Sequence, residues 1–324
     1  MMQKEIDVTA LGELLIDFTE NGVSSQGNAL LEANPGGAPC NVLAMLGKLG
    51  KKTAFIGKVG NDQFGNMLRN TIESVGIDAE SLVIDDKVHT TLAFVHTYPD
   101  GDRDFSFYRN PGADMMLRKE EVSLEKICAS KIFHFGTLSF THAGIRTASQ
   151  YAIQCAKEAG ALISFDPNLR EPLWENLEDA RKAIEYGMEC CDILKISDNE
   201  LTFMTGEKDY DKGAVLLQQK YQIPLVCVTL GKDGSRAYYK GLTIKSESFL
   251  QKNTIETTGA GDTFTGCMLN TVLDKGLDNL TGEDIRGMLR FANAGAALIT
   301  TKRGALRVMP EKEEIEALLE EQTE

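Results

Sequence analysis

Short apolar runs rich in β-branched residues alternate with longer segments of helical periodicity along most of this chain. This alternation predicts a mainly parallel sheet with helices on both faces, which is a three-layer α/β/α sandwich. The strands are expected at residues 8–11, 53–56, 131–135, 161–165, 193–196 and 225–229. The helices are expected at residues 39–49, 64–75, 143–159, 176–190, 212–221, 263–275 and 285–300. An active site in such a fold lies at the carboxyl ends of the strands.

Two segments, residues 14–35 and 88–112, interrupt this rhythm because they are rich in Thr, Phe, Tyr and turn residues. They are typical of antiparallel hairpins, and Pro99-Asp100-Gly101 is the expected turn of the second one. Neither hairpin is large enough to be a domain. We therefore expect one domain over residues 1–324, with the two hairpins paired as a small β-sheet lid, and an acidic helix from Glu311 to its end.

The charge balance excludes several classes of partner. The chain carries 34 Lys and Arg against 48 Asp and Glu, a formal charge of -14, which repels nucleic acid and anionic membrane surfaces. No apolar run reaches the length of about 18 residues that a membrane span needs. The seven cysteines are scattered without a C-x-x-C pair, which is typical of reduced core residues. These features predict a cytoplasmic protein that acts on a small molecule.

The segment from Glu256 to Gly266, ETTGAGDTFTG, is the most informative for chemistry. Glycines at a strand-to-helix turn leave the backbone N–H groups of Gly259, Ala260 and Gly261 able to bind a phosphate, and the helix dipole adds positive potential. Asp262 is then placed to accept a proton from an alcohol that attacks this phosphate. An ordinary glycine turn with Asp262 as the helix cap would use the same residues. The segment matches neither a P-loop nor a complete dinucleotide fingerprint.

The chain resembles the PfkB, or ribokinase-like, carbohydrate kinases, and among them most closely the fructokinases. The C-terminal signature of that family, [DE]-[ST]-T-G-A-G-D-x-F, is met from Glu256 to Phe264. The N-terminal signature is met by residues 36–41, GGAPCN, followed by residues 55–65, FIGKVGNDQFG. The resemblance implies a ribokinase-like fold. It also implies an ATP-dependent sugar kinase with Asp262 as the catalytic base and Gly259 to Gly261 as the anion hole.

The resemblance also implies residues for ATP and the metal. The run from Thr229 to Gly234 is similar to the family's T-x-G-x-x-G segment, and residues 195–200 stand where many relatives carry N-x-x-E. In this chain Ser197 replaces the Asn, as in fructokinases. The residues implied on the ATP side are Lys195, Thr229, Gly231, Gly234 and Asn293. Glu200 is implied to hold Mg²⁺ through water, and Glu256 with Thr258 to bind K⁺.

On the sugar side, carboxylates, amides and paired glycines suit the binding of neighbouring hydroxyl groups. The residues implied around the sugar are Asp17, Gly36, Gly37, Asn41, Phe107, Arg109 and Asn168. Arg109 is expected to reach the sugar from the lid, with Phe107 as an apolar wall. Arg170, the last residue of a D-x-N-x-R motif at a strand end, is implied to neutralise charge on the transferring phosphoryl group.

The resulting expectation is transfer of phosphate from ATP to D-fructose at the 6-hydroxyl or, less favoured, the 1-hydroxyl. A 2-keto-3-deoxygluconate kinase stays open because Arg109 and Arg170 could bind a carboxylate. A ribokinase or nucleoside kinase is disfavoured by the G-G-A-P-x-N and S-D-N-E-L forms of the motifs. A catalytically silent sugar- or nucleotide-binding regulator is the alternative outside the enzymes. A homodimer through the lid is expected because free strand edges invite pairing.

Overall fold

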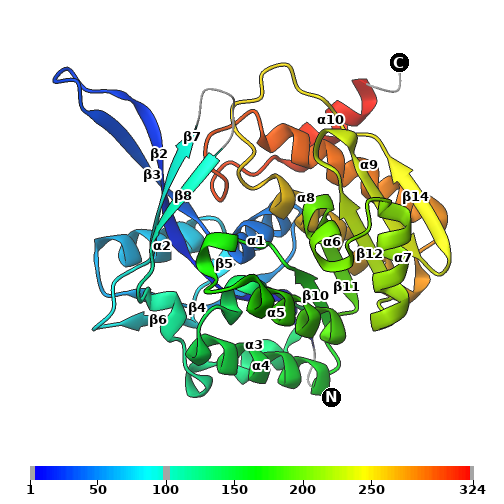
Figure 1. Cartoon of the computed structure of the whole chain (residues 1–324), viewed down its shortest axis with the longest axis horizontal. Helices are drawn as coiled ribbons and strands as arrows, with labels where there is room; N and C mark the ends of the chain where they lie inside the picture. The colour runs from blue at the N-terminus through cyan, green and yellow to red at the C-terminus, as the bar shows by residue number, and fades with distance from the viewer. Residues whose placement is uncertain (1–3, 98–102, 322–324) are drawn as a thin grey trace.

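A mainly parallel sheet forms the middle layer of the molecule, and helices cover both of its faces (Figure 1). The computed structural model describes residues 4–97 and 103–321. The strand order is β14-β13-β12-β11-β10-β9-β1-β4-β5, with β6 also paired to β4. The strands are β1 (Ile6–Leu11), β4 (Thr53–Gly60), β5 (Ile77–Asp78), β6 (Leu82–Asp85), β9 (Ser130–Gly136), β10 (Leu162–Asp166), β11 (Ile193–Ser197), β12 (Leu225–Thr229), β13 (Ser235–Tyr239) and β14 (Leu242–Ser246).

The helices divide between two apolar cores, one on each face of the sheet. One core is formed with α1 (Ala38–Lys48), α2 (Gln63–Ser74), α8 (Ala260–Lys275), α9 (Gly282–Ile299) and α10 (Lys312–Glu321). The other is formed with α3 (Leu124–Cys128), α4 (Ala143–Glu158), α5 (Leu177–Cys190), α6 (Asp198–Thr205) and α7 (Tyr210–Tyr221). Successive strand residues serve opposite cores, as Ile132 and Phe133 do, because side chains alternate along a strand. The predicted three-layer α/β/α fold is confirmed.

The six predicted strands and seven predicted helices are all present, with ends that differ by a few residues. The parallel pairing runs from β12 to β4 and on to β5, as the alternation predicts. The antiparallel hairpin of β13 and β14 and the short helix α6 were not predicted. Their apolar runs are too short to give a clear periodicity.

The two interrupting segments form a separate four-stranded sheet in the order β3-β2-β7-β8. Its strands are β2 (Leu15–Val23), β3 (Ala29–Gly36), β7 (Leu92–Thr97) and β8 (Arg103–Tyr108). The pairs β2/β3 and β7/β8 are antiparallel hairpins, and β2 joins β7 in parallel. Figure 1 shows the β2–β3 hairpin projecting from the body. The predicted turn at Pro99-Asp100-Gly101 lies outside the described residues.

Two further sequence expectations can be compared with this fold. All seven cysteines are free thiols, but only four of them, Cys40, Cys191, Cys227 and Cys267, are buried as core residues. Across residues 4–97 and 103–321, no helix combines the length and the apolar character needed to cross a membrane.

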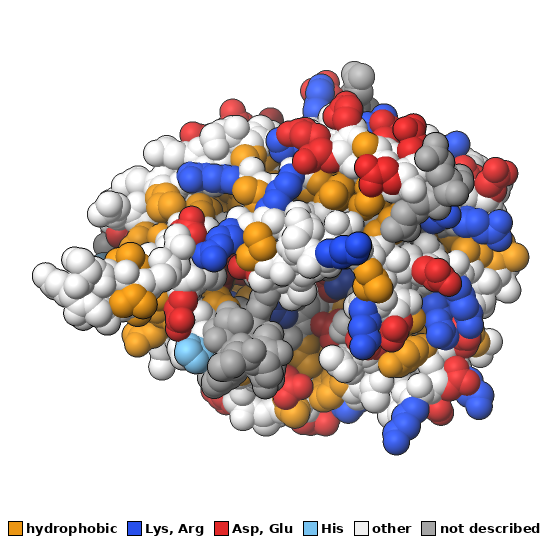
Figure 2. All heavy atoms as spheres, turned by 90° about the horizontal axis from the view of Figure 1, so that it is seen from above, with side chains coloured by type: hydrophobic (Ala, Val, Ile, Leu, Met, Phe, Trp, Pro, Cys, Tyr) orange, Lys and Arg blue, Asp and Glu red, His pale blue; other side chains and the backbone are white. Residues whose placement is uncertain are grey.

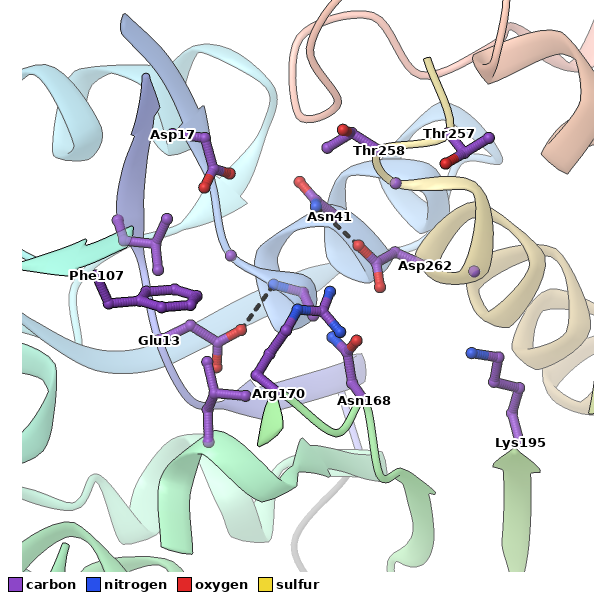
Figure 3. A pocket seen from close by; sticks show the side chains of 16 residues that line it. Glu13, Asp17, Asn41, Phe107, Asn168, Arg170, Lys195, Thr257, Thr258 and Asp262 are labelled. Atoms are coloured by element: carbon purple, nitrogen blue, oxygen red, sulfur yellow. Dashed lines mark hydrogen bonds between the residues drawn. The ribbon is translucent and has the colours of Figure 1, made fainter. Parts of the chain in front are cut away.

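Helices α1 and α8 lie side by side on the same face of the sheet, and both begin at its carboxyl edge (Figures 1 and 3). Gly266 of α8 makes this close approach possible, since a Cβ atom there would lie 2.7 Å from the Cβ of Met45 in α1. The first turns of both helices therefore meet directly above the ends of β10 and β11.

Candidate active site

A cavity of about 350 Å³ lies between the four-stranded sheet β3-β2-β7-β8, the lid of the sequence analysis, and the carboxyl edge of the main sheet. Figure 2 shows the molecule hollowed in this region, and Figure 3 shows the side chains that line the cavity. The cavity brings together these residues from the sequence prediction: Asp17, Gly37, Asn41, Phe107, Asn168, Arg170, Lys195, Thr258, Gly259, Gly261 and Asp262. They come from the lid, from α1, from the loop after β10, from β11 and from the start of α8.

Asp262 lies in the first turn of α8 and is only 9% exposed. Its Oδ2 accepts a hydrogen bond from Asn41 Nδ2 of α1 at 2.8 Å (Figure 3). Burial raises the pKa of Asp262 to about 6, and the charge of Asp166 acts in the same direction. The hydrogen bond from Asn41 and the charges of Lys195 and Arg170 oppose this rise. A carboxylate with a pKa of this size is a suitable proton acceptor near neutral pH.

The segment before α8 is a loop that follows the end of β14 at Ser246, not the direct strand-to-helix turn that the sequence predicted, but the loop ends in a glycine conformation. Gly259 has φ +77, in the left-handed region, and a Cβ atom there would lie 2.8 Å from the Cβ of Ala305. The structure differs from the expectation at Ala260, whose N–H donates to the carbonyl of Thr257 at 3.2 Å. The amide of Ala260 closes the turn, so an anion at the helix start would meet the N–H groups of Gly259 and Gly261 instead.

Lys195 places a buried positive charge next to this turn. Its Nζ lies 3.0 Å from Asp166 Oδ2, and a Cβ atom on Gly261 would lie 3.0 Å from the same Nζ. Burial opposes the charge, but the carboxylates of Asp166 and Glu200 outweigh it and raise the pKa of Lys195. Lys195 is therefore charged, and the absence of a side chain at Gly261 leaves its ammonium group close to the helix start.

A second cavity, of about 360 Å³, lies on the other side of the glycine turn. It is lined by the predicted ATP-side residues Thr229, Gly231, Gly234 and Asn293. A Cβ atom at Gly234, where φ is +87, would lie 2.1 Å from the carbonyl oxygen of Ser246, so only glycine fits this turn. Both cavities are lined by Thr257 and Gly261. The two cavities therefore meet at the glycine turn, beside Asp262.

The lid side of the first cavity holds two carboxyl groups, of which Glu13 is buried and Asp17 is half-buried. Asp17 lies on β2, and burial raises its pKa to about 7. A Cβ atom on Gly36 would lie 2.4 Å from Asp17 Oδ2, which explains the glycine at that position. Glu13, which the sequence analysis did not select, accepts a hydrogen bond from the N–H of Ala38 at 2.9 Å, and burial raises its pKa to about 7. A lone acid after Gly12 carried no signal that separated it from a surface residue.

The expectation that Arg109 reaches the sugar is not met in this arrangement. Its guanidinium is buried, lies 2.6 Å from Asp114 Oδ2 and donates to Thr141 Oγ1 and to the carbonyl of Leu138. Arg109 is therefore a structural anchor at the end of β8, because its charge is neutralised within the protein. Phe107, two residues before it, lines the cavity as predicted (Figure 3).

The predicted metal residues are held by the backbone around them. Glu200 Oε1 accepts from the N–H of Leu169 at 2.7 Å, and its Oε2 accepts from the N–H and hydroxyl of Ser197. Glu200 also lines a third cavity of about 360 Å³ together with Arg170 and Lys195. Glu256 Oε1 accepts from the N–H of Gly304 at 2.8 Å. Within the part of the chain that is described, no group of three or more His, Cys, Asp or Glu side chains is arranged to hold a metal.

Comparison with known proteins gives consistent similarities. Residues 5–312 match the family described as pfkB family carbohydrate kinase. The probable fructokinase-2 of Arabidopsis thaliana is 45% identical over 306 residues, which cover 94% of this chain and 92% of the relative. A fructokinase with bound ATP from Xylella fastidiosa has a TM-score of 0.89 at 30% identity, covering 99% and 100% of the two chains. A fructokinase double mutant from Vibrio cholerae O395, with fructose, ADP and a potassium ion bound, has a TM-score of 0.87 at 30% identity, covering 98% and 100%.

Proposed function

The chain belongs to the pfkB family of carbohydrate kinases, and from this premise we propose that it is a fructokinase. It transfers the terminal phosphoryl group of ATP to D-fructose, in preference at the 6-hydroxyl. The observation that carries this proposal is the position of Asp262, a buried carboxylate at the glycine turn where a cavity lined by carboxyl and amide groups meets a second cavity. We also infer that residues 1–324 form a single kinase domain with the small sheet as its lid.

In the proposed reaction, Asp262 removes the proton of the sugar hydroxyl as the oxygen attacks the terminal phosphorus of ATP. The bond from that phosphorus to the bridging oxygen breaks, and ADP leaves. The pKa of about 6 keeps Asp262 ionised at neutral pH, yet leaves it basic enough to hold the proton. The carboxylate becomes neutral in this step, which suits its buried position.

Positive groups around the glycine turn stabilise the charge on the transferring group. Lys195 and Arg170 supply cations, and the first turn of α8 supplies backbone N–H groups and the helix dipole. Glu200 would hold Mg²⁺ through water on the side of Lys195, and the ion when bound neutralises phosphate charge. Glu256 and Thr258 offer oxygen atoms to K⁺ beside the turn.

The charges of the first cavity favour a neutral acceptor over a sugar acid. Glu13, Asp17 and Asp262 place three carboxyl groups on its walls, against two cations, Arg170 and Lys195, of which Lys195 is already paired with Asp166. Arg109, the second cation considered for a substrate carboxylate, is already paired with Asp114. The carboxylate of 2-keto-3-deoxygluconate would therefore face more carboxyl groups than cations, whereas fructose offers hydroxyl groups that donate to carboxylates.

The lid also supports a proposal for assembly. Val23, Leu30, Leu31 and Tyr108 are exposed apolar side chains on or next to its strands, and β3 and β8 are its edge strands. A second copy of the chain that packs against this sheet would bury them, so we infer a homodimer through the lid. The free cysteines are compatible with a reducing compartment, so we infer a cytoplasmic enzyme.

The test is a coupled assay of ADP release across fructose, ribose, a nucleoside and 2-keto-3-deoxygluconate, with and without Mg²⁺ and K⁺. We expect fructose to have the highest kcat/KM. Asp262→Asn should keep the fold and nucleotide binding while kcat falls by about 10² or more. A variant that retains more than about a tenth of the wild-type rate would remove Asp262 from its role. Sugar binding without turnover by the wild-type protein would favour a silent regulator.

A further inference from the structure

Asn41 and Asp262 form the hydrogen bond that connects the two helices at the site. The donor Nδ2 and the acceptor Oδ2 are 2.8 Å apart, although the residues are 221 positions apart in the chain. Asn41 is 4% exposed and Asp262 is 9% exposed, so water competes little for this bond. A hydrogen bond to an ionised group in such surroundings is stronger than one between neutral groups.

The orientation of the Asn41 amide follows from the charge of its partner. An ionised carboxylate accepts hydrogen bonds and cannot donate one, so the NH₂ group of the amide must face Asp262. If the amide were turned, two oxygen atoms would face each other inside the protein. The Oδ1 atom of Asn41 consequently points away from Asp262.

Asn41 Oδ1 is a buried acceptor without a hydrogen-bond partner in the described chain. Buried polar atoms in native proteins are nearly always paired, and those left over often face a ligand site. Asn41 lines the sugar cavity, and because its Oδ1 is covered in this arrangement, a donor on the bound molecule reaches that atom once the cover moves aside. A sugar hydroxyl is such a donor, which makes Asn41 a bridge between the substrate and the base.

We propose that Asn41 is a positioning residue for Asp262, and this rests on the proposed kinase function. Its NH₂ group holds Oδ2 of the base, so that Oδ1 of Asp262 is the oxygen left to take the proton. Its own Oδ1 accepts a hydroxyl of the same sugar. One side chain thereby sets both the orientation of the base and the place of the acceptor. This role is distinct from that of a sugar ligand alone, because it changes the properties of Asp262.

The charged groups that face Asp262 come from four elements. Asp166 at the end of β10 and Asp17 on β2 disfavour its ionised form, while Lys195 on β11 and Arg170 in the loop after β10 favour it. Asn41 on α1 supplies the hydrogen bond that favours the ionised form, and this bond lowers the pKa of Asp262 more than either cation does. Loss of this bond therefore raises the pKa of the base, whereas loss of an ordinary sugar contact leaves it unchanged.

The experiment compares the pH dependence of kcat and kcat/KM for wild type, Asn41→Ala, Asn41→Asp and Phe107→Leu. The wild-type acid limb of kcat/KM should lie near pH 6. In Asn41→Ala we expect the limb to move up by about one pH unit and the plateau of kcat to fall by about tenfold. Asn41→Asp has the same shape, but it places a second carboxylate beside the base and should shift the limb further. Phe107→Leu, a neutral change in the same cavity, should raise KM and leave the limb in place.

The side-chain amide of Asn41 gives a second measurement that needs no change at that position. Its ¹⁵N resonance in the wild-type protein should titrate with the acid limb and should stop titrating in Asp262→Asn. The inference is overturned if both Asn41 variants raise KM with the limb and the kcat plateau unchanged, or if the amide resonance does not titrate. Those outcomes differ from failure of the kinase proposal, in which Asp262→Asn would remain active.

Discussion

Gly266→Ala tests whether the spacing of two helices sets the geometry of the base. Asn41 and Met45 lie one turn apart on α1, and Asp262 and Gly266 lie one turn apart on α8. A Cβ atom at Gly266 would lie 2.7 Å from Met45 Cβ, 2.8 Å from its Cγ and 3.1 Å from the carbonyl oxygen of Val42. Because Met45 Cβ is fixed to the α1 backbone, rotation of its side chain cannot relieve this contact.

The size of the effect follows from these distances. Ordinary contact begins at 3.4 Å, so the helices must separate by about 0.7 Å. The same movement would stretch the 2.8 Å bond between Asn41 and Asp262 to about 3.5 Å, the limit of a hydrogen bond. Overpacking costs about 1–3 kcal/mol, and replacing a helix-interior glycine by alanine returns about 1 kcal/mol. We therefore expect a loss of about 0–2 kcal/mol in stability, and a kcat about tenfold lower.

The assay measures thermal unfolding and the pH profile of kcat/KM for Gly266→Ala beside Gly295→Ala. Gly295 on α9 faces the other side of α8, where a Cβ atom would lie 3.0 Å from Cys267 Sγ. This control changes packing on α8 without touching the contact with α1, so its acid limb should match wild type. If Gly266→Ala lowers the Tm but keeps the wild-type kcat and acid limb, the spacing of α1 and α8 does not control the reactivity of Asp262.

Two other substitutions test buried charges around the sugar cavity. Urea unfolding should show that Glu13→Gln becomes more stable than wild type as the pH rises from 4.5 to about 7. The difference in unfolding free energy should reach up to about 3 kcal/mol and stay level above pH 7. A difference that does not change with pH would contradict this prediction. The reason is that burial raises the pKa of folded Glu13 from 4.5 to about 7, so the unfolded state alone ionises within that window. Asp114→Asn should cost about 3–5 kcal/mol, because it leaves Arg109 charged and unpaired in a site where both side chains are at most 3% exposed. Pairing Arg109→Met with Asp114→Leu should recover most of that loss, and a double variant no more stable than Asp114→Asn would argue against a charge effect.

The layers of the fold could be predicted from the sequence because they depend on local periodicity. Runs such as 193–196 and 225–229 are apolar except for Lys195 and Thr229 near their carboxyl ends, as expected for strands that are buried on both faces. The lid segments were also identifiable, because their turn residues break the helical pattern. The sequence predicted that the two hairpins pair in one sheet, but not which strands join them. The parallel pairing of β2 with β7 depends on contacts between distant segments.

The site was predictable where one motif supplies both the backbone conformation and the chemistry, as the turn at Gly259 does. It was less so where a residue's role depends on a partner. Arg109 was expected at the sugar, but Asp114 captures it within the same turn region. The bond from Asn41 to Asp262 joins residues that no local pattern relates. Long-range pairing of polar groups follows from tertiary packing, and one sequence contains little information about it.

The alternation of side chains along the strands explains why the charges that surround Asp262 lie on the α1–α8 side of the sheet. Ile132 and Ile193 belong to the core that α1 and α8 cover, and His134 and Lys195 follow them by two residues on the same strands. Because side chains alternate, Lys195 must face the same helices as Ile193, and Asp166 faces α8 through Thr265. On this face β10 and β11 are therefore charged near their carboxyl ends, where Asp166 pairs with Lys195. A shift of one residue in β11 would turn Lys195 into the apolar core that α5 to α7 cover, away from Asp166, and the start of α8 would lose its cation.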